Sequence, residues 1–292
     1  MFISGNNYMA KLLYIAILCG LMVFQGLYAQ SKYHKEIPLS DEDLIDVQLE
    51  AAFGTVNISG GARNSILIAD MLTEPSLDMK TDINYRVENH TGLLGLILEP
   101  TDRQGRTWGI GSTDAGTWDL QFNNDIPSRF DIEMGAGRGN FDFTGMTVNH
   151  FNLSAGASRI TVRFDEPNKG FIENMHIESG VSRFTGENFG NANFGSLKFE
   201  GGVGAYTLDF GGDLRNEARV QVELGIGAVT LIIPDHIGAK LHAEQRLFSS
   251  VNVPDDFERV NRNEYISKNY ETAEGKLIIN IESGFGSVRV RR

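Results

Sequence analysis

The sequence is poor in cysteine, proline, tryptophan and positive charge. Its single cysteine, Cys19, lies near the N-terminus, so the rest of the chain offers no disulfide, cysteine nucleophile or thiolate metal site. The 26 Lys and Arg residues against 38 Asp and Glu residues give a formal net charge of -12. Because binding to nucleic acid depends on clustered cations, no nucleic acid partner is expected. A content of 7 Pro beside 33 Gly in 292 residues does not fit collagen or a disordered linker.

Long apolar runs are also scarce, and the longest one lies at residues 12–24. It follows Lys11 and precedes Leu27, Tyr28 and Ala29, which is the pattern of a secretory signal peptide. We expect cleavage after Ala29. The run is shorter than the ~20 apolar residues that span a bilayer, so no membrane-spanning segment is expected after signal removal. The sequence therefore predicts an extracytoplasmic protein that is periplasmic, attached to the cell surface or secreted.

A twelve-residue unit recurs through the rest of the chain. It reads apolar, polar, apolar, Glu, any residue, Gly, any residue, Gly or Ser, any residue, apolar, polar, apolar. The central position is occupied by Ala52, Gly135, Gly156, Gly180, Gly202, Gly225 and Gly284. From Gly135 to Gly225 the successive spacings are 21, 24, 22 and 23 residues.

This unit describes two strands joined by a corner. Alternation with a period of two on both sides of the centre is typical of strands with one buried face, and the central glycines suit a tight corner. One alternative is a meander sandwich, whose hairpins would show the same alternation. A constant coil length favours stacked coils, because it puts equivalent residues over one another at ~4.8 Å. We therefore predict an all-β fold, a parallel β-solenoid with coils of about 21–24 residues and irregular capping segments at both ends.

The repeat also predicts the domain organisation. Residues 1–29 form the signal peptide, residues 30–45 an N-terminal extension, and residues 46–292 a single solenoid domain. Repeat regularity is lost at residues 61–124 and 234–276. We interpret both stretches as caps or longer coils, because irregular terminal segments protect open strand edges.

Two stretches carry a family resemblance. Residues 151–158, followed by 161–164 and 166–168, resemble the toast-rack family of bacterial extracytoplasmic proteins. Residues 222–234 resemble the C-terminal domain of LiaF-like cell-envelope stress proteins. The resemblance implies a β-solenoid related to adhesin heads, with toast-rack coils over 46–233 and LiaF-like coils and a cap over 234–292. It implies no catalytic residues.

An acidic column lies two residues before the repeat centres. It consists of Glu50, Glu133, Glu178, Glu200, Glu223 and Glu282, and Ser154 interrupts it. At the coil spacing, repulsion between such carboxylates is about 1 kcal/mol even in water. Exposure to solvent, pairing with Arg138, Arg159 and Arg183, or a bridging Ca²⁺ would relieve it. The repeat typical of calcium-binding β-rolls is absent, so neither a metal nor another cofactor is expected.

The candidate binding residues are drawn from this column and from the tryptophans. They are Glu133, Glu178, Glu200, Glu223, Trp108 and Trp118. The tryptophans would either stack on a sugar ring or cover an end of the core. The alternative of a glycan-cleaving β-helix enzyme would draw on Asp131, Glu133, His176, Glu178 and Arg183. These are also the outward positions of alternating strands, where polar residues are expected without any function, so no catalytic residue is predicted.

Together these patterns predict a non-enzymatic β-solenoid of the cell envelope or secreted medium. It would act as a scaffold or as an adhesion and binding module, with an envelope polysaccharide or another envelope protein as its partner. A glycan-cleaving enzyme and an accessory protein of the envelope stress response remain the alternatives.

Overall fold

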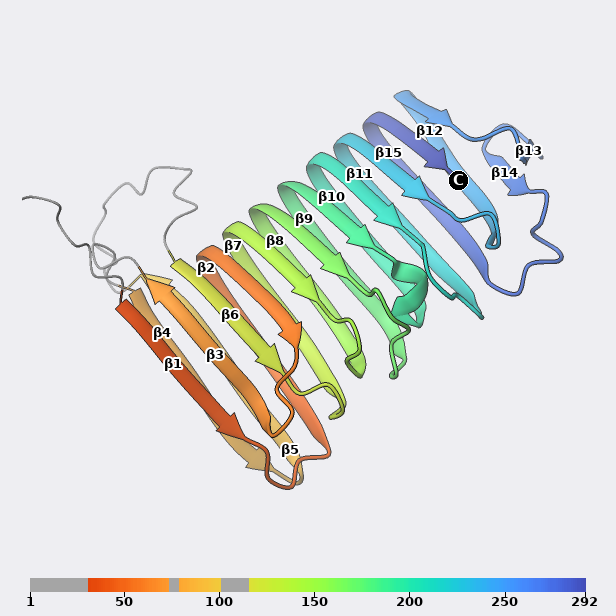
Figure 1. Ribbon diagram of the computed structural model, residues 1–292. Helices are drawn as coiled ribbons and strands as arrows, with labels where there is room; N and C mark the ends of the chain where they lie inside the picture. Colours follow the sequence, from red (N-terminus) through yellow and green to blue (C-terminus); the bar gives the residue numbers. More distant parts are fainter. Residues whose placement is uncertain (1–30, 74–78, 101–115) are drawn as a thin grey trace, which may run out of the picture. The chain divides into compact units, whose positions relative to one another are not determined.

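The computed structural model describes residues 31–73, 79–100 and 116–292, all within the compact unit Ser31–Arg292 (Figure 1). Trp108 and the predicted cleavage site at Ala29 lie outside the described residues. Within them the chain is almost entirely β, and strands that follow one another in the stack are mostly parallel. The prediction of an all-β parallel solenoid is confirmed.

Within the part of the chain that the structure describes, eight long strands form the stack of coils. In spatial order they are β2 (Leu44–Gly60), β7 (Ser128–Asp142), β8 (Val148–Arg163), β9 (Ile172–Glu187), β10 (Phe194–Asp209), β11 (Glu217–Ile232), β15 (Lys276–Arg291) and β12 (Gly238–Asn252). A short 3-10 helix, η1 (Phe189–Ala192), lies between β9 and β10. Each long strand runs through a corner at the repeat centre.

Shorter strands close the two ends of the stack. They are β1 (Ser31–Pro38), β3 (Ser65–Thr73), β4 (Met79–Glu88), β5 (Thr91–Pro100) and β6 (Gly116–Phe122) at one end, and β13 (Phe257–Arg259) and β14 (Glu264–Ser267) at the other. Many of their pairings are antiparallel, including β1 with β3 and β13 with β14. The strand β1 lies within the segment that the sequence predicts as an N-terminal extension, and here it is part of the sheet.

Equivalent residues of the repeat lie in register. Leu153 of β8 is opposite Ile177 of β9, which is opposite Phe199 of β10, and all three side chains are buried. Parallel pairing of this kind excludes the alternative in which consecutive units form hairpins. The sequence repeat is therefore a spatial column, with one residue contributed by each coil.

The glycines of the corner are required by the close approach of successive coils. Gly227 has a φ of 144°, a region that favours glycine, and a Cβ there would lie 1.9 Å from the carbonyl oxygen of Gly204. At the centre of the same corner, a Cβ on Gly225 would lie 2.6 Å from the oxygen of Gly202. No side chain fits between the coils at either position, which explains the repeated Gly-x-Gly.

Aromatic side chains fill the interior between the two halves of the coils. Phe199, before the corner of β10, packs against Tyr206 after it, with ring centroids 5.2 Å apart. Phe199 also contacts Phe184 of the neighbouring coil at 5.2 Å. Because these contacts join both halves of one coil to the next coil, the core is continuous along the stack.

The order of coils differs from the order of the chain at the C-terminal end. The last strand, β15, lies between β11 and β12 and pairs in parallel with both (Figure 1). The antiparallel strand β14 covers the other edge of β12, and β13 pairs with β14. The chain thus passes from β11 to β12, forms the cap, and returns to fill the coil between them.

The coil at the other end is built from two strands. The strand β5 pairs with the first half of β2, and β6 pairs with its second half. The carbonyl of Gly116, at the start of β6, faces the corner glycine Gly54.

This geometry predicts the effect of a methyl group at the corner. We expect Gly227→Ala to destabilise the protein by about 2 kcal/mol or more, because it combines an unfavourable φ with a backbone clash. In thermal unfolding followed by circular dichroism this is a drop in Tm of roughly 4–8 °C. Gly95→Ala is the control, since its Cβ would have Asn84 Cβ at 4.0 Å as its nearest neighbour. Equal Tm values for the two variants would contradict the tight corner.

Candidate functional site

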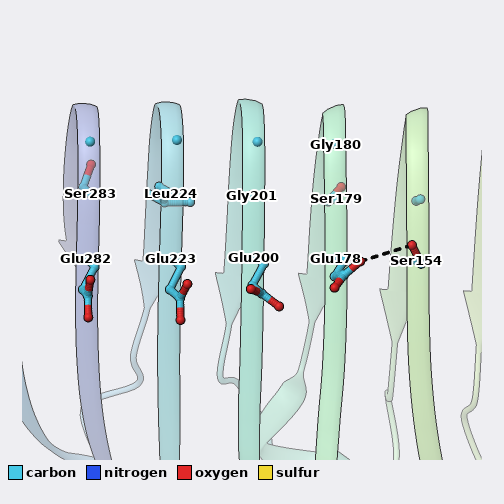
Figure 2. Close-up of a pocket in the computed structure, with 14 residues that line it drawn as sticks. Ser154, Glu178, Ser179, Gly180, Glu200, Gly201, Glu223, Leu224, Glu282 and Ser283 are labelled. Carbon is cyan, nitrogen blue, oxygen red and sulfur yellow. Dashed lines mark hydrogen bonds between the residues drawn. The ribbon is translucent and has the colours of Figure 1, made fainter.

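The acidic column predicted from the repeat forms a continuous ladder along the corners. Parallel pairing brings Glu178 opposite Glu200, Glu200 opposite Glu223, and Glu223 opposite Glu282. Figure 2 shows these four side chains in a row on successive strands, with Ser154 next to Glu178. The register extends the ladder in both directions, through Ser154, Glu133 and Glu50 on one side and Glu244 on the other.

The ladder borders an open trough of about 560 Å³ that crosses five coils. Its lining combines the carboxylates with small residues of the corner, namely Ser154, Ala155, Glu178, Ser179, Gly180, Glu200, Gly201, Gly202, Glu223, Leu224, Gly225, Glu282, Ser283 and Gly284. A second hollow of about 280 Å³ continues the line of corners and includes Glu50, Glu99 and Glu133. The corner glycines leave the trough open, because they have no side chains that could fill it.

A lysine and a histidine from the neighbouring column contact the ladder, and the lysine partly compensates its charge. The Nζ of Lys198 lies 2.9 Å from Oε1 of Glu200 and 3.8 Å from Oε1 of Glu223. The Nε2 of His176 lies 2.7 Å from Oε2 of Glu200 and 3.7 Å from Oε1 of Glu178. Hydrogen bonds from Lys198 and then His176 lower the pKa of Glu200 below its ordinary value, and Glu200 in turn raises the pKa of Lys198.

The sequence-based candidates for charge compensation were different residues. Arg138, Arg159 and Arg183 also stack in register, and they form an exposed column beyond the corner. The described ion pairs of the ladder involve Lys198 and His176 and not these arginines. The partners lie on the same strand face as the glutamates, two positions before them, where the side chains run alongside the carboxylates.

Trp118, the tryptophan that lies within the described residues, is part of the core. Trp118 is only 2% exposed and lies on β6, in register with Val56 of β2. A ring buried in this way offers no face to a sugar, which corrects the expectation of a stacking platform at this residue. The period-two pattern already favoured an inward position, because Leu120 and Phe122 follow at the same phase and are also buried.

The ladder includes one group with the composition of a metal site. Ligand atoms of His176, Glu178 and Glu200 lie within 4.8 Å of one another. The Lys198 ammonium at Glu200 opposes a further cation there, so these residues fit an ion-pair network better than a metal site.

Glu200 is poorly suited to act as the general acid in glycan cleavage. A glycosidase needs one carboxyl group whose pKa is raised, so that it is protonated and can act as the general acid. Lys198 and His176 shift the pKa of Glu200 in the opposite direction. The carboxylate of Glu178 is exposed and accepts a weak 3.4 Å hydrogen bond from Ser154.

An exposed apolar column runs beside the trough, one residue after the corner centre. Val181, Val203, Ile226 and Phe285 lie in register on β9, β10, β11 and β15, and they are between 46% and 66% exposed. Of the earlier coils, β7 and β8 carry Ala136 and Ala157 at this position, and β2 carries Phe53. We call the four exposed side chains the apolar stripe. They come one residue after the glycines that line the trough, whereas the glutamates come two residues before those glycines.

In-register parallel coils with a trough along their corners define a β-solenoid repeat protein. The chain belongs to the toast-rack family, since the family model for the N-terminal domain of toast_rack matches residues 28–187. The model for the C-terminal region of LiaF, named for the cell wall-active antibiotics response, matches residues 185–290. The resemblance inferred from the sequence motifs is thereby confirmed.

The solved structures to which the chain is similar are distant in sequence. A candidate cell adhesion protein from Clostridium sporogenes is 19% identical, with 90% of this chain and 99% of that chain covered and a TM-score of 0.45. A candidate adhesin from Bacteroides fragilis is 9% identical, with 90% and 98% covered and a TM-score of 0.28. No curated protein sequence matches the chain. Within the described residues, no helix has the length and apolar character needed to cross a bilayer.

The ion-pair network makes a prediction about titration. We expect Lys198→Met to raise the pKa of Glu200, because the variant removes the ammonium that stabilises the ionised carboxylate. Carboxyl-carbon NMR titration of the purified protein would measure the shift. Lys169→Met is the control, because Lys169 pairs with Asp125 in a different part of the fold. A Glu200 pKa that responds equally to both variants, or to neither, would contradict the network.

Proposed function

We propose that this protein is a non-enzymatic, extracytoplasmic adhesion or binding module that binds its partner along the corner trough. Residues 1–29 would direct export and be removed after Ala29, and residues 46–292 would act as one solenoid domain. An envelope polysaccharide or another envelope protein is the partner class that such a location makes available. Glu133, Glu178, Glu200 and Glu223 are the proposed contact residues.

The observation that carries this proposal is the repetition of one surface pattern over successive coils. Carboxylates, corner glycines and apolar side chains recur at the ~4.8 Å spacing of parallel strands. The trough is open along its length, so a long ligand can lie in it without threading. An extended partner would contact the same chemical groups on each successive coil. Many weak contacts would then combine to give a higher overall affinity.

The rigidity of the stack supports the same conclusion. Each corner is held by ladder pairing to the coils on both sides, and the core beneath the trough is continuous. The positions of the carboxylates are therefore set before a ligand arrives. Binding to a preformed surface avoids much of the ordering cost that a flexible site has to overcome.

Binding of the purified protein to isolated envelopes of the producing organism tests the proposal. We expect saturable binding that weakens at least tenfold in the double variant Glu178→Lys with Glu223→Lys, because the trough would then repel a partner that contacts its carboxylates. The matched control is Glu173→Lys with Glu258→Lys, which changes the net charge equally at exposed sites outside the trough.

Two results would contradict the proposal. One is envelope binding that is absent, or that the trough variant and the control variant change equally. The other is release of reducing ends or unsaturated sugars from envelope polysaccharide, which would favour the glycan-cleaving alternative. Unchanged thermal unfolding of both variants would show that loss of binding reflects the surface and not the fold.

A further inference from the structure

The apolar stripe and the glutamate ladder flank the corner glycines that line the trough, and together they restrict the chemistry of its ligand. We infer that the trough over β9, β10, β11 and β15 binds a basic amphipathic helix of a partner protein. The lysines or arginines of that helix would face the ladder, and its aliphatic side chains would face the stripe. This inference rests on the proposed function and specifies its partner.

Apolar side chains as exposed as Val181, Val203 and Ile226 are unusual as a continuous column. Scattered exposed hydrophobics are normal, but an aligned row beside a groove is typical of an interaction surface. Four of the five coils that line the trough carry Val181, Val203, Ile226 and Phe285, whereas the fifth coil, β8, and the preceding coil, β7, carry alanine, and β2 carries Phe53. The stripe and the trough are therefore parts of one surface.

The charges on this surface favour a cationic partner. Glu178, Glu200, Glu223 and Glu282 follow one another at the coil spacing. Lys198 shows that an ammonium group fits between successive rungs, because its Nζ reaches both Glu200 and Glu223. A basic side chain supplied by a ligand would make the same kind of contact with the exposed carboxylate of Glu178.

The same charges disfavour other occupants. A second copy seated on this surface would bring two glutamate ladders together. An anionic polymer or membrane surface would be repelled for the same reason. A glycan would gain little here, since the trough lining, all of it within the described residues, contains no aromatic ring for a sugar to stack on, and the stripe contributes Phe285 alone.

An α-helix matches the surface in both length and period. It advances about 5.4 Å per turn, close to the ~4.8 Å between coils, so residues on one helix face meet successive rungs over a short distance. A helix of about 15 residues is roughly 22 Å long and spans the four coils of the stripe. The exposed Arg183 lies on the stripe side of the corner, two residues after Val181, so the basic face of the helix must turn toward the glutamates.

A synthetic peptide of about 15 residues tests the inference. The probe contains leucine and lysine placed so that a helix has one apolar and one basic face, and its partner probe has the same composition in scrambled order. We expect the two-faced peptide to bind the purified protein at least tenfold more tightly in calorimetric titration. The affinity should fall as salt is added, since part of it comes from charge.

Two pairs of variants separate the contributions of the stripe and the ladder. We expect Val203→Ser with Ile226→Ser to weaken binding of the two-faced peptide at least tenfold, with Val260→Ser, which is 60% exposed and outside the stripe, as the control. Glu178→Gln with Glu223→Gln should weaken binding and reduce its salt dependence, with Glu173→Gln as the control. Equal affinity for the two-faced and scrambled peptides, or stripe variants that bind like wild type, would overturn the inference.

Treatment of envelopes distinguishes this inference from the proposed function. If trough-dependent binding is lost after protease digestion and competed by the two-faced peptide, the partner is a protein and the inference is supported. If binding is lost only after glycan digestion, the inference is wrong while the proposed binding function stands. If no trough-dependent binding occurs in untreated envelopes, the proposed function itself fails.

Discussion

The close approach of successive corners constrains the whole structure. A glycine of one coil meets a backbone carbonyl of the neighbouring coil at a distance that excludes even a methyl group, as at Gly225 and Gly227. This contact fixes the position along the stack and the register between coils. Once the register is fixed, the residues at each remaining position of the repeat form a column along the stack. The properties of the surface then follow from the residue type in each column.

Columns of like residues have opposite consequences inside and outside the stack. Inside, they bring aromatic rings such as Phe184 and Phe199 into contact and build a continuous core. Outside, they bring carboxylates close together, where each neighbour opposes ionisation of the next. The solenoid tolerates this because the ladder is open to solvent and because Lys198 and His176 lie alongside it. A surface that carries such repulsion is well prepared for a ligand of opposite charge.

The sequence was sufficient to predict the coils that keep the repeat. Its spacing gave the coil length, and the glutamate column lies where the alternation put it, with Glu178 opposite Glu200 and Glu200 opposite Glu223. The repeat does not predict β12 as a coil, because this strand has no glycine at the corner and contains a register shift between Gln245 and Phe248. The stretch from Leu241 to Glu244 has the apolar, polar, apolar, Glu pattern and was the signal that could have revealed it.

Other features depend on tertiary contacts that a repeat does not encode. The insertion of β15 between β11 and β12 is set by the cap, in which β14 covers the far edge of β12. The ion-pair partners of the ladder depend on side-chain directions on one strand face, which spacing alone does not distinguish from positions beyond the corner. In the sequence the apolar stripe is only a variable position that follows the central glycine and precedes Gly or Ser, and its exposure is evident from the structure.

The claim that equivalent residues form columns can be tested directly with engineered disulfides in a Cys19→Ser background. Thr207 and Thr230 lie opposite each other on β10 and β11, whereas Ala228 is offset from Thr207 by two residues. Cysteines at opposite positions of neighbouring strands fall within the Cα separation that a disulfide allows, and an offset of two residues exceeds it. We predict that Thr207→Cys with Thr230→Cys crosslinks under mild oxidation and that Thr207→Cys with Ala228→Cys does not. Crosslinking of the offset pair in preference to the opposite pair would contradict the register on which the trough depends.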